Sequence, residues 1–150
     1  MQDFMQMWEC FFDDLGSCKK MVLSTSLDDK VTSRMMSMII INREFYFQTD
    51  INFRKYEQIK YNPNVSLCAD NIQIEGLCKE TGQPSENPIF CSLYQKYFTS
   101  SYNRYTNLSN ERLFVIKPTS IRKWIYENNI PMMESYDFSK KHYSKNRYFG

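Results

Sequence analysis

The fold of this chain is decided by residues 25–80, which read TSLDDKVTSRMMSMIIINREFYFQTDINFRKYEQIKYNPNVSLCADNIQIEGLCKE. Runs rich in β-branched and aromatic residues lie at Lys20–Leu27, Val31–Ile41 and Phe45–Thr49. Each run is separated from the next by only a few polar, turn-forming residues. Because a parallel pair needs a long crossover, these short links predict three consecutive antiparallel strands.

The second half of this stretch predicts a short helix and two further strands. Apolar residues recur at helical spacing over residues 53–61. The helix is expected to end before Pro63, because the residue that precedes a proline avoids the helical conformation. The strands are expected at Val65–Ala69 and Ile72–Lys79, and Gly76 inside the latter indicates a bulge or a close backbone approach.

The flanking sequence adds helices and one more strand. Residues 4–15 show amphipathic helical spacing, and Gly16 follows as a stop signal. A second flanking helix is expected to begin at Pro88. The run Leu113–Ile116 predicts a sixth strand, which Pro118 is expected to end.

Composition supports a β-rich fold of one domain. The chain has a single alanine, Ala69, against 11 Tyr and 11 Phe, which favours strands over a helical bundle. Its 150 residues fit one domain spanning 1–150. Within it we expect an N-terminal helix in residues 1–16 and a C-terminal tail over residues 127–150.

Several classes of protein are disfavoured by the composition. The net charge of +2 is too small to indicate a nucleic-acid binder. Apolar runs reach only four residues, as in Met38–Ile41, far below a membrane span. The five cysteines lack zinc-ligand spacing and His142 is the only histidine, so no metal site is expected. We expect reduced thiols in a cytoplasmic protein, with a catalytic Cys–His142 pair as the alternative.

Four residues of the deciding stretch indicate an anion site. Arg34 lies on the second predicted strand, Thr49 ends the third, and Arg54 and Lys55 open the following helix. A hairpin brings the two strand positions together, and a helix N-terminus offers free backbone N–H groups. Three cations and a hydroxyl match a phosphate monoester. The alternative is a solvated cationic face.

These residues also carry a resemblance to a known family. The stretch resembles the pyridoxamine-5′-phosphate-oxidase-like family of FMN-binding split-barrel proteins, above all its small nitroimidazole-resistance and general-stress members. The similarity covers Thr25 to Glu80. Its matching pieces, in order, are Arg34-Met35-Met36, Phe47-Gln48-Thr49, Arg54-Lys55, Gln58-Ile59, Asn62-Pro63, Val65–Leu67 and the strand that ends at Gly76.

The resemblance implies a fold, a cofactor and an assembly. The fold is mainly β with flanking helices, a six-stranded antiparallel split β-barrel with Greek-key connections that binds FMN. The family forms homodimers with FMN at the interface. The implied FMN-binding residues are Arg34, Arg54 and Lys55 with Thr49 at the phosphate, Met35, Met36 and Ser37 along the ring, Gln48 at the ring edge, Asn71 from the second subunit, and Trp124 as a stacking residue.

The implied function is an FMN-dependent oxidoreductase. Electrons would pass to or from a small organic substrate, with NAD(P)H as a plausible source, while FMN itself supplies the redox chemistry. No side chain stands out as a catalytic group. Lys140 stands where the oxidase proper has the arginine of its Arg-x-His, so oxidation of pyridoxamine phosphate is not expected. The alternatives are a non-catalytic flavin carrier or sensor, haem or deazaflavin in the same groove, and ordinary packing for Trp124.

Overall fold

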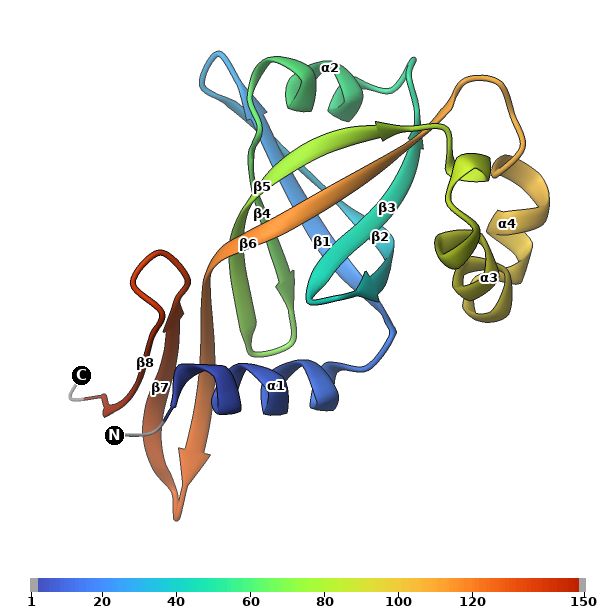
Figure 1. Ribbon diagram of the computed structural model, residues 1–150. Coiled ribbons are helices and arrows are strands. Elements are labelled where there is room, and N and C mark those ends of the chain that lie inside the picture. Colours follow the sequence, from blue (N-terminus) through green and yellow to red (C-terminus); the bar gives the residue numbers. More distant parts are fainter. Residues whose placement is uncertain (1–2, 149–150) are drawn as a thin grey trace.

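The computed structural model describes residues 3–148 (Figure 1). Residues 1–2 and 149–150, the outer ends of the expected N-terminal helix and C-terminal tail, lie outside the described residues. In chain order the elements are α1 (Phe4–Leu15), β1 (Cys18–Leu27), β2 (Lys30–Ile41), β3 (Glu44–Asp50), α2 (Arg54–Tyr61), β4 (Asn64–Ala69), β5 (Ile72–Gly82), the 3-10 helix η1 (Pro84–Glu86), α3 (Pro88–Tyr97), α4 (Thr99–Tyr105), β6 (Glu111–Glu127), β7 (Ile130–Asp137) and β8 (His142–Arg147).

Six strands form a closed antiparallel barrel. Their order is β3-β2-β1-β4-β5-β6, and β3 also pairs with β6 from Phe45 opposite Ile116 to Asp50 opposite Glu111. After the β1-β2-β3 meander, β4 returns to lie beside β1, which is the Greek-key order. The predicted fold class, a mainly β six-stranded antiparallel split barrel with flanking helices, is therefore confirmed.

The sheet continues beyond the barrel through its last strands. β6 pairs with β7, and β7 pairs with β8, in an extension that stands away from the barrel (Figure 1). The structure thus places strands in residues 127–147, where the sequence predicted a tail. β7 reads Ile-Pro-Met-Met-Glu-Ser-Tyr-Asp, which does not alternate apolar and polar residues, and most of its residues are half-buried. Without that alternation a strand has no periodic signal in the sequence.

β6 is much longer than predicted because Pro118 does not end it. Pro118 lies between Ile116, the last partner of β3, and Ser120, the first partner of β7. The pairing of β5 with β6 also shifts register here, next to Gly76. A strand tolerates proline at such an irregularity. A Cβ atom on Gly76 would lie 2.7 Å from Ile116 Cγ2, which confirms the predicted close approach.

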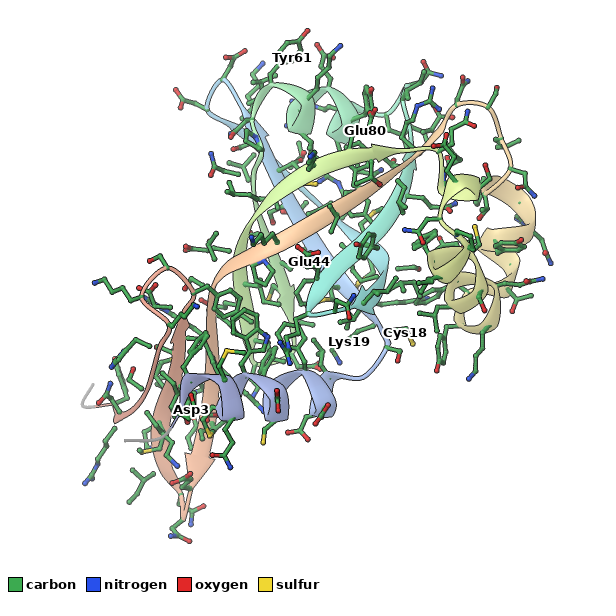
Figure 2. All side chains as sticks on the ribbon, viewed as in Figure 1. Asp3, Cys18, Lys19, Glu44, Tyr61 and Glu80 are labelled. Atoms are coloured by element: carbon green, nitrogen blue, oxygen red, sulfur yellow. The ribbon has the colours of Figure 1, made fainter. Side chains whose placement is uncertain are left out.

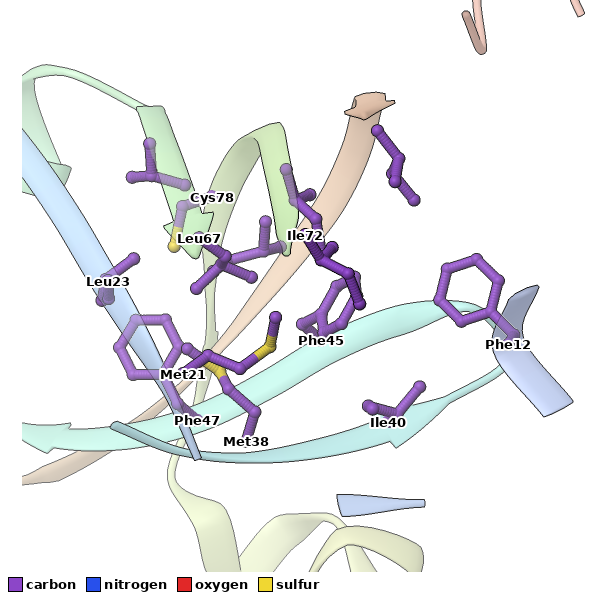
Figure 3. Close-up of a cluster of buried hydrophobic side chains, with 14 of the residues drawn as sticks. Phe12, Met21, Leu23, Met38, Ile40, Phe45, Phe47, Leu67, Ile72 and Cys78 are labelled. Atoms are coloured by element: carbon purple, nitrogen blue, oxygen red, sulfur yellow. The ribbon is translucent and has the colours of Figure 1, made fainter. Parts of the chain in front are cut away.

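α1 covers one end of the barrel (Figure 1). The Asp3 carboxylate caps it by accepting a hydrogen bond from the Met5 N–H, and Gly16 ends it with φ of 84°. Its buried face joins Phe11 and Phe12 to the barrel core, part of which is shown in Figure 3. At 12 residues it is the longest helix described within 3–148, and none there is long and apolar enough to cross a membrane.

A second, smaller cluster fixes the α3–α4 pair to the outside of the barrel. Ile39 of β2 and Leu113 of β6 are buried against Phe90 and Tyr94 of α3. The rings of Phe90 and Tyr94 stack with centres 4.9 Å apart. The helix predicted from Pro88 is present, and a second helix, α4, which was not predicted, follows it. This helical pair becomes one wall of the site described next.

Candidate functional site

A cleft of about 390 Å³ opens between the barrel and the α3–α4 pair. It brings together segments that are distant in the sequence: β2, β3, the start of α2, both helices of the pair and the start of β6. Its lining residues are Met35, Met36, Ser37, Gln48, Thr49, Asp50, Phe53, Lys55, Tyr94, Ser101, Tyr105, Leu108 and Glu111. Another groove, of about 300 Å³ along β1, β4 and β5, has Glu75 as its one charged lining residue and so lacks the cations that an anion needs.

α2 is held firmly over the open end of the barrel. The Tyr56 ring meets Phe114 of the core edge-on, with ring centres 5.8 Å apart. Tyr56 also forms a hydrogen bond with Glu80 of β5, which lies near the barrel end beside α2 (Figure 2), and this bond raises the pKa of Tyr56. Ile59 is buried in the core, whereas Tyr61 at the end of the helix is exposed. These contacts fix where the first turn of α2 points.

Arg34 is fixed by a hydrogen-bond network that reaches α2. Its guanidinium donates to Thr25 Oγ1 at 2.9 Å, to Thr32 Oγ1 and to the Leu23 carbonyl. The same two hydroxyls donate to Oε1 of the buried Gln58, at 2.6 and 2.7 Å. Burial and the neighbouring Arg54 lower the pKa of Arg34. The guanidinium is therefore held in one place beside the start of α2.

Lys55 is the cation that lines the cleft. It is half-buried, and burial together with Arg34 lowers the pKa of Lys55, while Glu111 and Asp50 raise it. Its Nζ lies 4.5 Å from the centre of the Phe53 ring. Arg54 is exposed and lines a neighbouring hollow on the side of Asp28 and Glu57. The three predicted cations thus lie within electrostatic reach around the start of α2, although only Lys55 borders the cleft.

Thr49 and Gln48, the adjacent residues at the end of β3, have different surroundings. Gln48 is buried, and its Oε1 accepts a hydrogen bond from Thr106 Oγ1 at 3.0 Å. Thr49 is 3% exposed, and its hydroxyl has no hydrogen-bond partner among residues 3–148. Buried hydroxyls nearly always have a partner. The Thr49 hydroxyl is therefore an unpaired group at the wall of the cleft.

The remaining predicted residues separate into two groups. Met35, Met36 and Ser37 of β2 line the cleft, and the Met35 side chain is 60% exposed. Asn71 and Trp124 lie together, away from the cleft. Asn71 Nδ2 donates to the Trp124 backbone carbonyl at 2.6 Å, and the Trp124 backbone N–H donates to the Asn71 backbone carbonyl at 3.0 Å. Asn71 borders a small hollow beside α1. Within one chain, neither residue lines the cleft.

Two carboxyl groups in the cleft were missed by the sequence analysis. Asp50 of β3 and Glu111 of β6 are direct partners across the barrel seam. Glu111 is 5% exposed, and burial and Asp50 raise the pKa of Glu111 to about 7, although Lys55 and a hydrogen bond from Gln48 oppose the shift. No local pattern marks this pair, because Glu111 approaches Asp50 only through closure of the barrel between β3 and β6.

Comparisons with known proteins support the fold. No protein-family model matches the chain, and no curated protein does. Among solved structures, general stress protein 26 from Bacillus anthracis is 27% identical, with a TM-score of 0.56 over 71% of this chain and 84% of that one. A pyridoxamine 5′-phosphate oxidase-related, FMN-binding protein from Nostoc punctiforme is 11% identical, with a TM-score of 0.64 over 87% of each chain. HutZ, the haem storage protein of Vibrio cholerae, is 13% identical, with a TM-score of 0.57 over 67% of this chain and 81% of that one.

The closed six-stranded barrel with a helix over its open end and a cleft against its outer face defines a split β-barrel protein. Solved structures that share this arrangement include a pyridoxamine 5′-phosphate oxidase-related protein and general stress protein 26. The chain therefore shares the split β-barrel fold of the pyridoxamine 5′-phosphate oxidase-like proteins.

Proposed function

We propose that the cleft binds FMN and that the protein is an FMN-dependent oxidoreductase acting on a small organic molecule. The observation that carries this proposal is the Thr49 hydroxyl, which is buried without a partner among residues 3–148 and lies at the cleft wall with Lys55. Leaving a buried hydroxyl unpaired costs about 1–3 kcal/mol. A phosphate oxygen bound there would remove that cost.

The charges around α2 also favour a phosphate monoester. Burial lowers the pKa of Arg34 and of Lys55, and a neighbouring cation adds to this in each case, Arg54 for Arg34 and Arg34 for Lys55. An anion carrying nearly two negative charges would turn that repulsion into attraction. Phe53, the residue before α2, gives no side-chain cap to the first turn. Backbone N–H groups at the helix start therefore remain suited to an anion.

The rest of the cleft suits a flat ring system. Met35, Met36 and Ser37 of β2 line the cleft, and methionine adapts its shape to a planar ligand. Tyr94 and Tyr105 of the α3–α4 pair form part of the opposite wall. FMN, once bound, would supply the electron transfer, and the protein would orient it and exclude water. A reduced nicotinamide is the proposed electron source.

We also propose a homodimer in which Asn71 and Trp124 of one subunit contact the FMN that is bound in the cleft of the other. Both lie away from the cleft of their own chain and close to each other. The resemblance assigns an amide at the position of Asn71 to the second subunit. All five cysteines are free, as in proteins of the reducing cytoplasm, and we propose that compartment.

Mixed dimers test this shared site. One variant chain carries Arg54→Ala with Lys55→Ala, and the other carries Asn71→Ala with Trp124→Ala. If sites are shared, random mixing makes half of the dimers mixed and half of their sites intact, so about a quarter of all sites bind FMN. Sedimentation checks the dimer, and FMN titration counts the sites. A mixture that binds no more FMN than its components contradicts the shared site.

Non-catalytic binding is the second candidate function. A flavin carrier or sensor would use the same cleft, and haem is a further ligand because HutZ, a haem storage protein, has this fold. Haem generally needs an axial side-chain ligand. His142, the only histidine, is on β8 in the extension beyond the barrel and does not line the cleft. Methionine and tyrosine, which can also ligate haem iron, do line the cleft. FMN is preferred over haem because Lys55 and the unpaired Thr49 hydroxyl suit a phosphate.

The experiment that tests the function is a spectrum followed by a titration. Purified protein is expected to show flavin absorption bands, or to quench the fluorescence of added FMN. Arg54→Ala with Lys55→Ala should weaken FMN binding by about 100-fold or more, at about 1.5–3 kcal/mol for each charge-assisted hydrogen bond. Lys60→Ala, at the other end of α2, is the matched control. Unchanged affinity in the double variant would place the site elsewhere.

Turnover then separates an enzyme from a carrier. An oxidoreductase consumes NADH or NADPH steadily when a quinone or nitroaromatic acceptor is added to the FMN-loaded protein. A carrier consumes at most one equivalent per bound FMN. A Soret band with no flavin binding would favour haem and overturn the proposal.

A further inference from the structure

The cleft proposed to bind a dianion also contains two carboxyl groups. Asp50 and Glu111 lie opposite each other on β3 and β6, and both line the cleft together with Lys55. Three ion pairs are found among residues 3–148, and none of them includes Asp50 or Glu111. A phosphate that approaches Lys55 therefore meets two acids that form none of these ion pairs.

We propose that Glu111 is the proton-linked residue of this cleft, and that it takes up a proton when the phosphate of FMN binds beside Lys55. This inference rests on the proposed function. Glu111 is 5% exposed, so water screens its charge poorly. Its backbone N–H donates a hydrogen bond 3.1 Å long to the Leu108 carbonyl, which fixes the backbone position from which the side chain reaches the cleft.

Every element packed around Glu111 contributes to its titration. Asp50 on β3 disfavours its charge, whereas Lys55 on α2 and a hydrogen bond from Gln48 favour it. Tyr94 on α3 is influenced by Glu111 in turn, and Tyr105 of α4 lines the same cleft. In this balance, burial dominates and raises the pKa of Glu111 to about 7. Glu111 is thus an acid whose protonation near neutral pH a nearby negative charge can favour.

A bound dianion shifts this balance in one direction. It engages Lys55, a cation that stabilises the Glu111 carboxylate, and adds like charge beside it. The pKa of Glu111 then rises further on binding. By linkage, a group whose pKa is higher in the complex makes binding weaken as pH rises through the window between its free and bound values. FMN affinity should therefore fall between about pH 7 and pH 9.

The test compares the wild-type protein with Glu111→Gln, which removes the charge and keeps the shape. FMN titrations are made from about pH 6 to pH 9, and the ratio of the two dissociation constants is taken at each pH. This ratio cancels the ionisation of the FMN phosphate itself, which lies near pH 6. If binding raises the pKa by about one unit, the wild-type constant rises about eightfold relative to the variant.

Two further variants and a proton count sharpen the result. Glu44→Gln, a glutamate at the other end of β3 (Figure 2), is the matched control and should follow the wild type. Asp50→Asn should keep the proton link but move it to lower pH. Calorimetry in two buffers of different ionisation enthalpy should show roughly half a proton more taken up by the wild type than by Glu111→Gln near pH 7.5.

The outcomes separate the two proposals. If the wild type binds FMN and the ratio stays flat from pH 6 to pH 9, the role of Glu111 is wrong and the FMN site stands. If the wild type binds no FMN at any pH, both are overturned. Should Glu111→Gln not fold, carbon-13 NMR of the glutamate carboxyls in the wild type replaces it. A Glu111 pKa that FMN leaves unchanged then overturns the proposal.

Discussion

Arg34 on β2 and Gln58 on α2 bind the same two hydroxyl groups, those of Thr25 and Thr32. The guanidinium donates to both hydroxyls, and both hydroxyls donate in turn to the Gln58 carbonyl oxygen. This series of hydrogen bonds connects the β1–β2 hairpin to α2, the helix that carries Arg54 and Lys55. The cations of the proposed phosphate site are therefore positioned by one network, although their residues lie 20 positions apart along the chain.

Gln58→Ala should reduce both stability and FMN affinity. Gln58 is buried, and its loss leaves two threonine hydroxyls without their acceptor. We expect the free energy of unfolding to fall by about 1–3 kcal/mol, measured by urea denaturation. FMN affinity should fall as well, because Arg34 loses its fixed position. Gln73→Ala on the exposed side of β5 serves as the control, and an equal loss there would contradict the network's role.

Thr49→Val should leave the free protein stable while weakening FMN binding. The Thr49 hydroxyl has no partner among residues 3–148, so the free protein loses no hydrogen bond with it. Binding loses about 1 kcal/mol or more, a roughly fivefold to tenfold weaker affinity.

Thr106→Val is the contrasting variant. Its buried hydroxyl donates to Gln48, so this change should destabilise the free protein by about 1–2 kcal/mol. A Thr49→Val protein that loses as much stability as Thr106→Val would show that Thr49 has a structural partner instead.

Glu111 should make the stability of the free protein depend on pH. Burial and Asp50 raise the pKa of Glu111 from 4.5 to about 7, so the folded chain binds more protons than the unfolded chain between these values. Stability from this group therefore falls as pH rises from about 4.5 to 7. Glu111→Gln should be more stable than the wild type above pH 7, with the difference shrinking below pH 5 in urea melts. A constant difference across this range would exclude the titration.

Gly76→Ala should destabilise the barrel. The new Cβ would lie 2.7 Å from Ile116 Cγ2 and 2.8 Å from the Lys117 carbonyl oxygen. Forcing β5 and β6 apart should cost about 1–3 kcal/mol in thermal or urea unfolding. Glu75→Ala, the exposed neighbour on the same strand, should have a small effect. A Gly76→Ala protein as stable as the wild type would show that the bulge is free to shift.

Local pattern was enough to predict most of the barrel. Short polar links fixed three antiparallel strands, because no other pairing can be reached across so few residues. Helical spacing and Pro63 correctly placed α2, and Gly16 correctly ended α1. The predicted β6 was too short. Proline usually ends a strand, but Pro118 lies beside a bulge, where the strand continues through it. β7 and β8 were not predicted. Most of their residues are half-buried or exposed, so neither strand has a buried face that would give the sequence an apolar alternation.

The amino-acid sequence by itself determined the meander, the short helix and the presence of Arg34, Arg54 and Lys55 around the start of that helix, since all of these follow from neighbours in the chain. Only the tertiary structure decided that Thr49 is buried without a partner, and that Asp50 meets Glu111 in the cleft. The physical reason is barrel closure: the pairing of β3 with β6 joins segments about 60 residues apart, and contacts of that kind carry no local signal.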